Sequence, residues 1–245
     1  MRPPMLARTF SRTAVRNSVK GWLMSEKCDG VRALWDGTRF MSREGNELRV
    51  PAEIIATMPA GVELDGELWA GRGGLQRMVS LLRAAEQDVA RWSGVEFMVF
   101  DAPDARGGFE QRLTVAEERI SGCAFARVIP QFSVRDHRHM RLYLKEVLKG
   151  GGEGLVLRQA GSAYVSGRSK SMLKVKPVYT AEAMVSAHDA GVLVLRWGAV
   201  VFRLCAGIGS AALPPVGAMI TFSHLGLTDG GVPRSAAFLE VRDYE

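Results

Sequence analysis

The chain has 245 residues, of which 47% are apolar and 24% charged, and this balance excludes a disordered polyelectrolyte and indicates a folded protein. The sequence has no run of about 18 apolar residues, so we expect neither a membrane-spanning helix nor a membrane partner. Basic residues interrupt each apolar stretch near the N-terminus, which predicts a cytoplasmic protein, or a periplasmic one if a signal peptide has been removed. Three scattered cysteines predict neither a disulfide framework nor a zinc cluster.

The charge is positive and unevenly distributed. A net charge of +6 and a pI near 9.5 indicate an anionic partner such as nucleic acid. Residues 1–177 hold 28 basic and 20 acidic residues, a net charge of +8, whereas residues 178–245 hold 4 and 6, a net charge of −2. Arg8, Arg12, Arg16 and Lys20 are four residues apart, so on a helix they would form one basic stripe, either solvated or in contact with phosphates.

The predicted elements describe an α+β domain followed by an all-β module. Short strands are expected between Met24 and Val50, with a hairpin turn at Asp36-Gly37. Hydrophobic periodicity then predicts, in chain order, a strand over Val62–Trp69, a helix over Leu75–Trp92, a strand over Val95–Phe100, helices over Arg112–Ile120 and Val134–Leu148, and strands over Leu155–Arg158 and Met172–Lys176. After Pro177, short β-like runs separated by Gly and Pro predict a compact barrel. The expected domains are residues 1–177 and 178–245.

Charged residues inside apolar strands mark candidate functional positions, because a buried charge is costly unless it is paired or in use. Lys27 lies in the segment KCDGVR (27–32), where Gly30 permits close approach of the backbone to a bound phosphate. In LDGEL (64–68), period two places Asp65 and Glu67 on one face, and such a pair suits a metal ion or a ribose hydroxyl. In isolation the first segment also occurs by chance, and the second also fits a solvated edge strand.

Two further segments add a carboxylate and two ammonium groups. Glu153 enters the otherwise apolar strand EGLVLR (153–158). Lys174 and Lys176 share one face of a strand, and like charges side by side repel unless an anion such as phosphate lies between them. Carboxylates for a divalent metal and lysines for phosphates are the groups that phosphoryl or nucleotidyl transfer requires.

The order of these segments resembles the motif set of the covalent nucleotidyltransferases. K-x-D-G-x-R is followed by S-R-x-G at 42–45, L-D-G-E-L, F-D at 100–101, E-G-L-V-L-R and K-x-K. From about Met5 to about Lys176 the chain is most similar to the minimal ATP-dependent DNA ligases of bacteria and their phages. The resemblance implies an adenylation domain with antiparallel sheets, followed by an OB-fold barrel over residues 178–245. It also implies a monomer that seals nicks in double-stranded DNA with ATP and Mg²⁺, or with Mn²⁺ as a substitute.

The resemblance implies roles in nucleotide chemistry for four residues. Lys27 would attack the α-phosphate of ATP, release pyrophosphate and carry AMP as a phosphoramidate. The attack requires a neutral amine, which neighbouring cations and desolvation favour. Arg32 would hold phosphate on the nucleotide or on the nicked strand. Phe100 would stack on adenine, and Glu67 would contact the ribose.

The same resemblance implies sites for the metal and the DNA. Glu153 and Glu67 would hold the catalytic Mg²⁺, while Lys174 and Lys176 would neutralise the α-phosphate. Arg43 would bind the 5′-phosphate at the nick. AMP would pass to that phosphate, and the 3′-hydroxyl would then displace it and seal the strand.

Two features depart from the family pattern, and Cys28 fills its variable position. Ser25 stands where many ligases place an acidic residue for the adenine amino group, and Cys28, beside the nucleophile, is read as a small hydrophobe or an oxidisable thiol. The last motif of the family is echoed only by Arg242-Asp243. The alternatives are an RNA ligase or mRNA-capping guanylyltransferase, and an inactive nucleic-acid-binding homologue.

Overall fold

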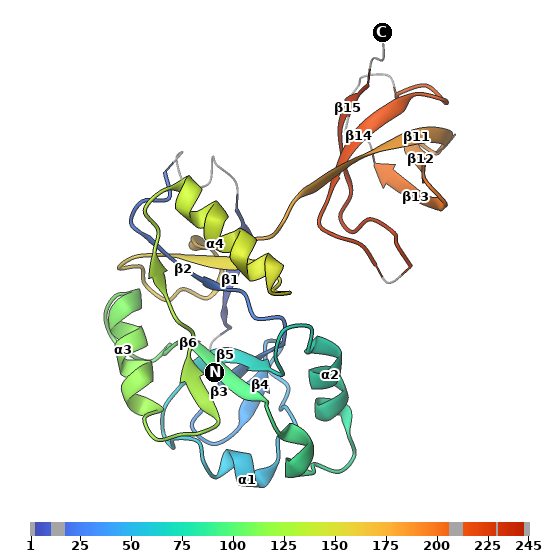
Figure 1. Ribbon diagram of the computed structural model, residues 1–245. Coiled ribbons are helices and arrows are strands. Elements are labelled where there is room, and N and C mark those ends of the chain that lie inside the picture. Colours follow the sequence, from blue (N-terminus) through green and yellow to red (C-terminus); the bar gives the residue numbers. More distant parts are fainter. Residues whose placement is uncertain (1–2, 11–17, 206–212, 229, 243–245) are drawn as a thin grey trace. The chain divides into compact units, whose positions relative to one another are not determined.

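A computed structural model describes residues 3–10, 18–205, 213–228 and 230–242 (Figure 1). Internal contacts divide the chain into two compact units, Met1–Val175 and Lys176–Glu245. In the part of the chain that is described, no helix is both long enough and apolar enough to cross a bilayer.

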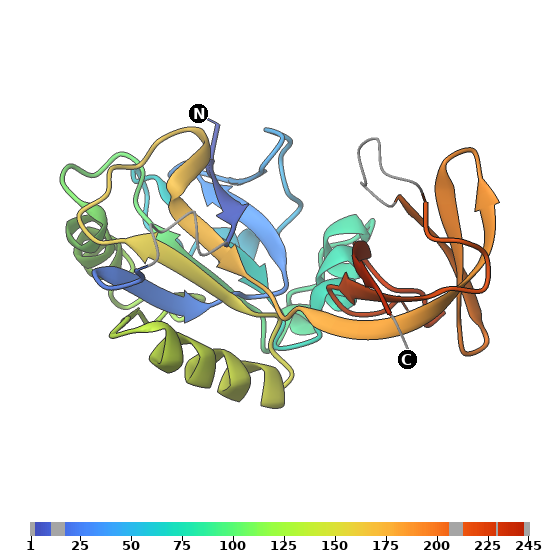
Figure 2. The same cartoon turned by 90° about the horizontal axis from the view of Figure 1, so that it is seen from above.

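Sheet A of the first unit has the strand order β1-β10-β9-β2-β8. Its strands are β1 (Met5–Thr9), β10 (Gly167–Val175), β9 (Leu155–Gln159), β2 (Trp22–Glu26) and β8 (Phe132–Ser133). Helix α4 (His137–Lys149) packs Met140 and Val147 against the apolar side chains of β2, β9 and β10, and Figure 2 shows it running along this sheet. This packing fixes the end of β2, where Lys27 follows.

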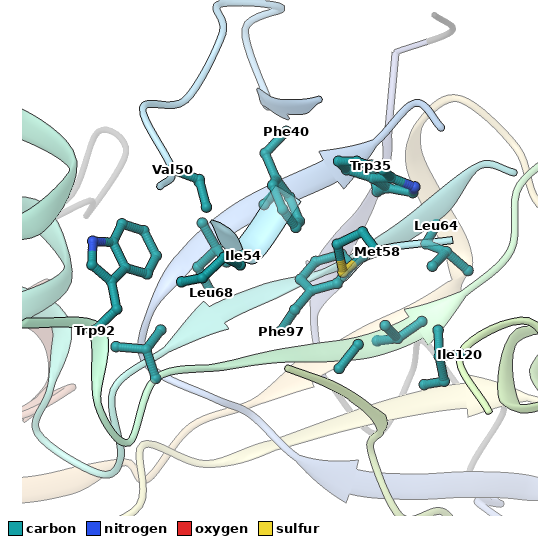
Figure 3. Packing of buried hydrophobic residues seen from close by; sticks show 14 of the residues in the cluster. Trp35, Phe40, Val50, Ile54, Met58, Leu64, Leu68, Trp92, Phe97 and Ile120 are labelled. Carbon is teal, nitrogen blue, oxygen red and sulfur yellow. The ribbon is translucent and has the colours of Figure 1, made fainter. Parts of the chain in front are cut away.

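Sheet B has the strand order β4-β3-β5-β6-β7. Its strands are β4 (Phe40–Ser42), β3 (Val31–Trp35), β5 (Leu64–Trp69), β6 (Glu96–Asp101) and β7 (Ala126–Val128), accompanied by α1 (Ala52–Ile55), α2 (Leu75–Arg83), the 3₁₀ helix η2 (Val89–Trp92) and α3 (Phe109–Arg119). Trp35, Phe40 and Phe97 lie in its core (Figure 3), with the Phe40 and Phe97 rings edge to face at 5.0 Å. A Cβ on Gly66 would lie 2.5 Å from the Phe97 ring, so this strand requires glycine there.

The expectation of antiparallel sheets is wrong for both sheets of the first unit, which are mixed. Strand β1 runs parallel to β10, and β7 runs parallel to β6. Helix α3 connects β6 to β7, and such a crossover is what allows consecutive strands to be parallel. The periodicity of a short strand does not carry its direction, so the sequence pattern could not show this.

The second unit contains one antiparallel sheet, sheet C, in the order β13-β12-β11-β14-β15. The strands are β11 (Tyr179–Asp189), β12 (Val192–Trp197), β13 (Val200–Cys205), β14 (Met219–His224) and β15 (Ala237–Val241). Their inward side chains, among them Val185, Leu195 and Phe222, form a separate core. The predicted all-β character is confirmed, but within the described residues no strand pairing closes the sheet into a barrel.

One local prediction differs from the structure, and another is confirmed. The helix predicted over Leu75–Trp92 ends at Arg83, where the Gln87 side chain donates to the carbonyls of Leu81 and Ala84 and supports a loop before η2. The hairpin turn at Asp36-Gly37 is present, since Asp36 Oδ1 accepts from the backbone of Thr38 and Arg39.

The prediction of a helical basic stripe near the N-terminus is wrong for the two of its residues that the structure describes. Arg8 lies in strand β1 rather than in a helix, because β1 pairs with β10, and Lys20 lies in a turn. Arg12 and Arg16 are outside the described residues.

Candidate active site

One pocket of the first unit gathers five of the predicted site residues. Strands of both sheets line it, and the predicted residues among its walls are Lys27, Arg32, Glu67, Phe100 and Lys174. Segments far apart in the sequence therefore meet at one cavity. Its walls also include apolar side chains, among them Val156, Ile129 and Phe109. Such a mixture of apolar surface and a few convergent charges is typical of a ligand site.

Lys27 is held at the end of β2 by backbone and side-chain contacts. Its backbone N–H donates to the carbonyl of Gly154 at 2.9 Å, and its Nζ lies 2.5 Å from Glu153 Oε2. The loop that follows can pass close to β5 only because Gly30 has no side chain; a Cβ there would lie 2.2 Å from the carbonyl oxygen of Leu68. The structure thus places the predicted nucleophile and a predicted metal ligand in direct contact.

Glu67 is a carboxyl group in a largely desolvated position. Burial raises its pKa to about 7, against the opposing effect of the Lys27 and Arg32 charges. A cation brought into the pocket would stabilise the ionised form of this carboxylate. A group poised near neutrality in a cleft is the kind of site where function is expected.

The Glu67→Gln variant tests whether the burial of this carboxyl group destabilises the folded protein when the group is ionised. Between pH 4.5 and 7 the native state retains a proton that the unfolded chain releases, so the free energy of unfolding of the wild type falls as pH rises. Glutamine removes this penalty. In nucleotide-free protein we expect the variant to gain up to about 3 kcal/mol relative to the wild type from pH 5 to pH 7.5, measured by urea unfolding at each pH. A stability difference that does not vary with pH would contradict the assignment.

Arg32 is fixed in place by several partners. Its Nε and Nη2 each donate to the carboxylate of Asp65 at 2.6 Å, and Nη2 also donates to the carbonyl of Met5. Its Cζ lies 4.5 Å from the centroid of the Phe100 ring, a cation–π contact that fixes the orientation of this aromatic wall. The Tyr164 hydroxyl donates to Asp65 as well, at 2.7 Å.

The expectation that Asp65 and Glu67 form one carboxylate pair for a metal or a ribose is therefore wrong for Asp65. Asp65 is completely buried and does not line the pocket, because its two oxygens accept from Arg32 and Tyr164. Its role is to hold Arg32, and only Glu67 of this segment faces the cavity.

A buried charge network that the sequence analysis missed lies behind the pocket. Asp101 accepts from Arg112 at 2.7 and 3.1 Å and from Arg158 at 2.6 Å, and all three side chains are at most 3% exposed. Arg158 lines the pocket, and its Cζ lies 4.3 Å from the Phe109 ring centroid. The sequence did hold a signal for this network, because Asp101 in F-D and Arg158 in E-G-L-V-L-R each lie at the end of an apolar strand. Their pairing could not be predicted, because it depends on how sheets A and B face each other.

Two residues close to Lys27 in the chain are buried. Cys28 is buried, and this burial raises the pKa of its thiol to about 12, so the thiol stays protonated and the reading as a small hydrophobe is favoured. Ser25 is buried and lines the pocket.

Two predicted residues of the first unit do not line the main pocket, and a third belongs to the second unit. Glu153 lines a neighbouring cavity with Asp29, Trp69 and Arg72, and its ion-pair partner Lys27 lines both cavities. Arg43 follows β4 in an exposed loop, where it pairs with Glu44 at 2.8 Å. Lys176 belongs to the second unit, so its position relative to the pocket is not described. Within the described residues, no group of three or more His, Cys, Asp or Glu side chains forms a metal site.

Two mixed sheets that bring a lysine amine, carboxylates and an aromatic ring to one pocket are the arrangement of a nucleotidyltransferase. Residues 4–176 match the family model of the ATP-dependent DNA ligase domain, and the chain belongs to this family. It is 30% identical to a DNA ligase of Haemophilus influenzae over 96% of this chain and 90% of that protein.

Solved structures agree with this assignment. A Lig E DNA ligase superimposes with a TM-score of 0.81 and 34% identity, covering 99% of this chain and 100% of the other. The Chlorella virus DNA ligase-adenylate shares the fold, with a TM-score of 0.58 and 20% identity over 100% and 99% of the two chains. Probable DNA ligases such as that of Pseudarthrobacter chlorophenolicus are longer, and the match covers 40% of that protein.

Proposed function

We propose that this ligase seals nicks in double-stranded DNA through a lysyl-AMP and a 5′-adenylylated DNA intermediate. The observation that carries the proposal is the position of Lys27, which lines the pocket and whose amine contacts Glu153. In the first step the Nζ lone pair forms a bond to the α-phosphorus of ATP and pyrophosphate leaves. The amine must lose a proton before it attacks, and Glu153 lies within hydrogen-bonding distance to receive it.

The other residues of the pocket would bind and orient ATP. Phe100, fixed by Arg32, offers its ring to adenine, and Glu67 faces the cavity as a partner for the ribose. Lys174 lines the same pocket and would neutralise the α-phosphate together with Lys176. This compensation favours the attack, because the negative charge of the α-phosphate oxygens would otherwise repel the electron pair of the amine.

A divalent cation fits the carboxylates of this site. Mg²⁺ prefers oxygen ligands, and Glu153 and Glu67 both lie close enough to Lys27 to interact with its charge. These two residues would hold Mg²⁺, or Mn²⁺ in its place. When bound, the ion would supply positive charge to the phosphate oxygens of ATP.

The DNA acceptor would be bound by residues outside the pocket. Arg43 is more than half exposed, as a residue that reaches the 5′-phosphate of a nick must be. We assign residues 1–177 as the adenylation domain and 178–245 as an OB-fold domain of a monomeric enzyme. Arg242 pairs with Glu182 at 2.9 Å within the second unit, and Asp243 lies outside the described residues.

A nick-sealing assay tests the proposal. We expect a nicked duplex with a 5′-phosphate to be sealed with ATP and Mg²⁺, and a nick with a 5′-hydroxyl to remain open. Transfer of GMP from GTP would indicate a capping enzyme, and preferential joining of RNA ends would indicate an RNA ligase. Failure to form any covalent nucleotide adduct, in protein first discharged with pyrophosphate, would support the inactive homologue.

The Arg43→Ala variant separates DNA binding from ATP chemistry. Loss of a charged phosphate contact should lower nick sealing about 10- to 100-fold, while self-adenylylation should change less than about two-fold. Rates of both steps with the same enzyme preparation give the comparison. Arg39→Ala is the matched control, because Arg39 is exposed on the same hairpin and pairs with Asp36 and Glu47. Equal losses in nick sealing and in self-adenylylation would contradict this role and would assign Arg43 to the ATP site.

A further inference from the structure

Arg72 connects three segments that carry the candidate active site. It lies in the glycine-rich turn after β5, the strand of Glu67. Its Nε and Nη2 donate to the two carboxylate oxygens of Glu26, both at 2.8 Å, and its Nη1 donates to the carbonyl of Gly150 at 3.0 Å. All three nitrogens of the guanidinium group are therefore engaged in fixed directions.

The partners of Arg72 lie shortly before Lys27 and Glu153 in the chain. Glu26 is the last residue of β2 and precedes Lys27, while Gly150 ends α4 three residues before Glu153. Lys27 and Glu153 are the pair that meets at 2.5 Å. A displacement of either segment would change this contact, and reacting groups lose rate steeply when they are misplaced by about 1 Å.

Two glycines of the turn after α4 leave room for the contacts between Arg72 and its partners. A Cβ on Gly150 would lie 2.0 Å from Nη1 of Arg72, and a Cβ on Gly152 would lie 2.9 Å from Oε1 of Glu26. The turn after α4 therefore leaves room for the guanidinium group and for the carboxylate. None of these residues belongs to the segments that the sequence analysis singled out.

We propose that Arg72 is a positioning residue for adenylyl transfer, which braces Lys27 against Glu153 through Glu26 and the Gly150 carbonyl. The inference rests on the proposed function. Arg72 does not line the nucleotide pocket, so it would act on the rate of transfer and not on ATP binding. With 38% of the Arg72 side chain exposed, this ion pair contributes little to overall stability, so a loss of activity would not be a loss of fold.

Pre-steady-state self-adenylylation over a range of ATP concentrations tests the brace. We expect Arg72→Gln to lower the maximal rate about ten-fold or more, with the half-saturating ATP concentration within two-fold of the wild type. Glu26→Gln should show a similar loss of maximal rate, and the double variant should reach a maximal rate no lower than that of the slower single variant, because the two residues act as a unit. Glu26 also lines the nucleotide pocket, so the half-saturating ATP concentration is compared in Arg72→Gln and not in Glu26→Gln. Arg72→Lys keeps the charge but not the planar fork, so it should recover only part of the rate.

The matched control is Arg77→Gln. Arg77 is an exposed arginine on α2 that also donates to backbone carbonyls, those of Arg91 and Ser93, but it does not contact Glu26. Its variant should adenylylate like the wild type. Three results would overturn the proposal: an unchanged maximal rate in Arg72→Gln, independent multiplied losses in the double variant, or full recovery in Arg72→Lys.

A second readout does not depend on activity. Hydrogen–deuterium exchange of the Lys27 amide, which donates to Gly154, and of residues 150–153 should become faster in Arg72→Gln and stay unchanged in Arg77→Gln. Unchanged exchange at these amides would also contradict the brace. If the wild type formed no adduct while this exchange difference appeared, the proposed function would fail and the brace would stand.

Discussion

Lys27→Ala is expected to abolish self-adenylylation, by a factor on the order of 10⁴ or more, because no other group replaces the amine that bonds to the α-phosphorus. The fold should remain intact. The Lys27 side chain is 26% exposed and its partner Glu153 is 20% exposed, so the ion pair contributes at most about 1 kcal/mol. Intact-protein mass spectrometry after incubation with ATP and Mg²⁺ should show one added AMP on the wild type and none on the variant.

Two controls sharpen the experiment. Lys20→Ala removes an exposed lysine from a turn near the start of β2 and should still be adenylylated. Lys27→Arg keeps the positive charge beside Glu153 without a nucleophilic amine, so it should also remain unmodified. All proteins are first treated with pyrophosphate to discharge AMP carried through purification. An AMP adduct on Lys27→Ala would refute the assignment of the nucleophile.

Asp101→Asn is expected to produce the largest loss of stability, about 3–5 kcal/mol of the free energy of unfolding of the first unit. Asp101 is the shared anionic partner of Arg112 and Arg158, and it is completely buried. Without it two guanidinium cations remain in a desolvated site. Burial and the adjacent Arg112 already lower the pKa of Arg158, which shows how unfavourable that environment is for a cation. Urea unfolding followed by tryptophan fluorescence measures the loss.

Asp104→Asn is the matched control for this prediction. The substitution is identical and lies three residues away, but Asp104 pairs with Arg119 where both side chains are partly exposed, at 33% and 23%. We expect its cost to stay below about 1 kcal/mol. Equal costs for the two variants would show that the buried network does not carry the charge compensation that its geometry implies.

The site could be predicted from sequence where a motif maps onto one strand or turn. Lys27, Glu67, Phe100 and Lys174 lie on short segments with a clear apolar period, and these segments meet at one pocket. Arg43 is outside its walls and Lys176 belongs to the second unit, so their roles stay predictions. The partners of Arg32 and Arg158 could not be predicted, because Asp65 and Asp101 reach them only when strands from distant segments are paired.

The sequence alone was sufficient for the class of the enzyme, most of the strands and helices, and the identity of the candidate nucleophile, because these depend on local periodicity and on the order of motifs. The tertiary structure decided which charged side chains face the pocket and which are paired behind it. Glu67 faces the pocket, while Asp65, two residues away, accepts hydrogen bonds from Arg32 and Tyr164. It also showed that Arg72 reaches Glu26 and Gly150. Such contacts join residues far apart in the chain, so only the packing of the sheets determines them.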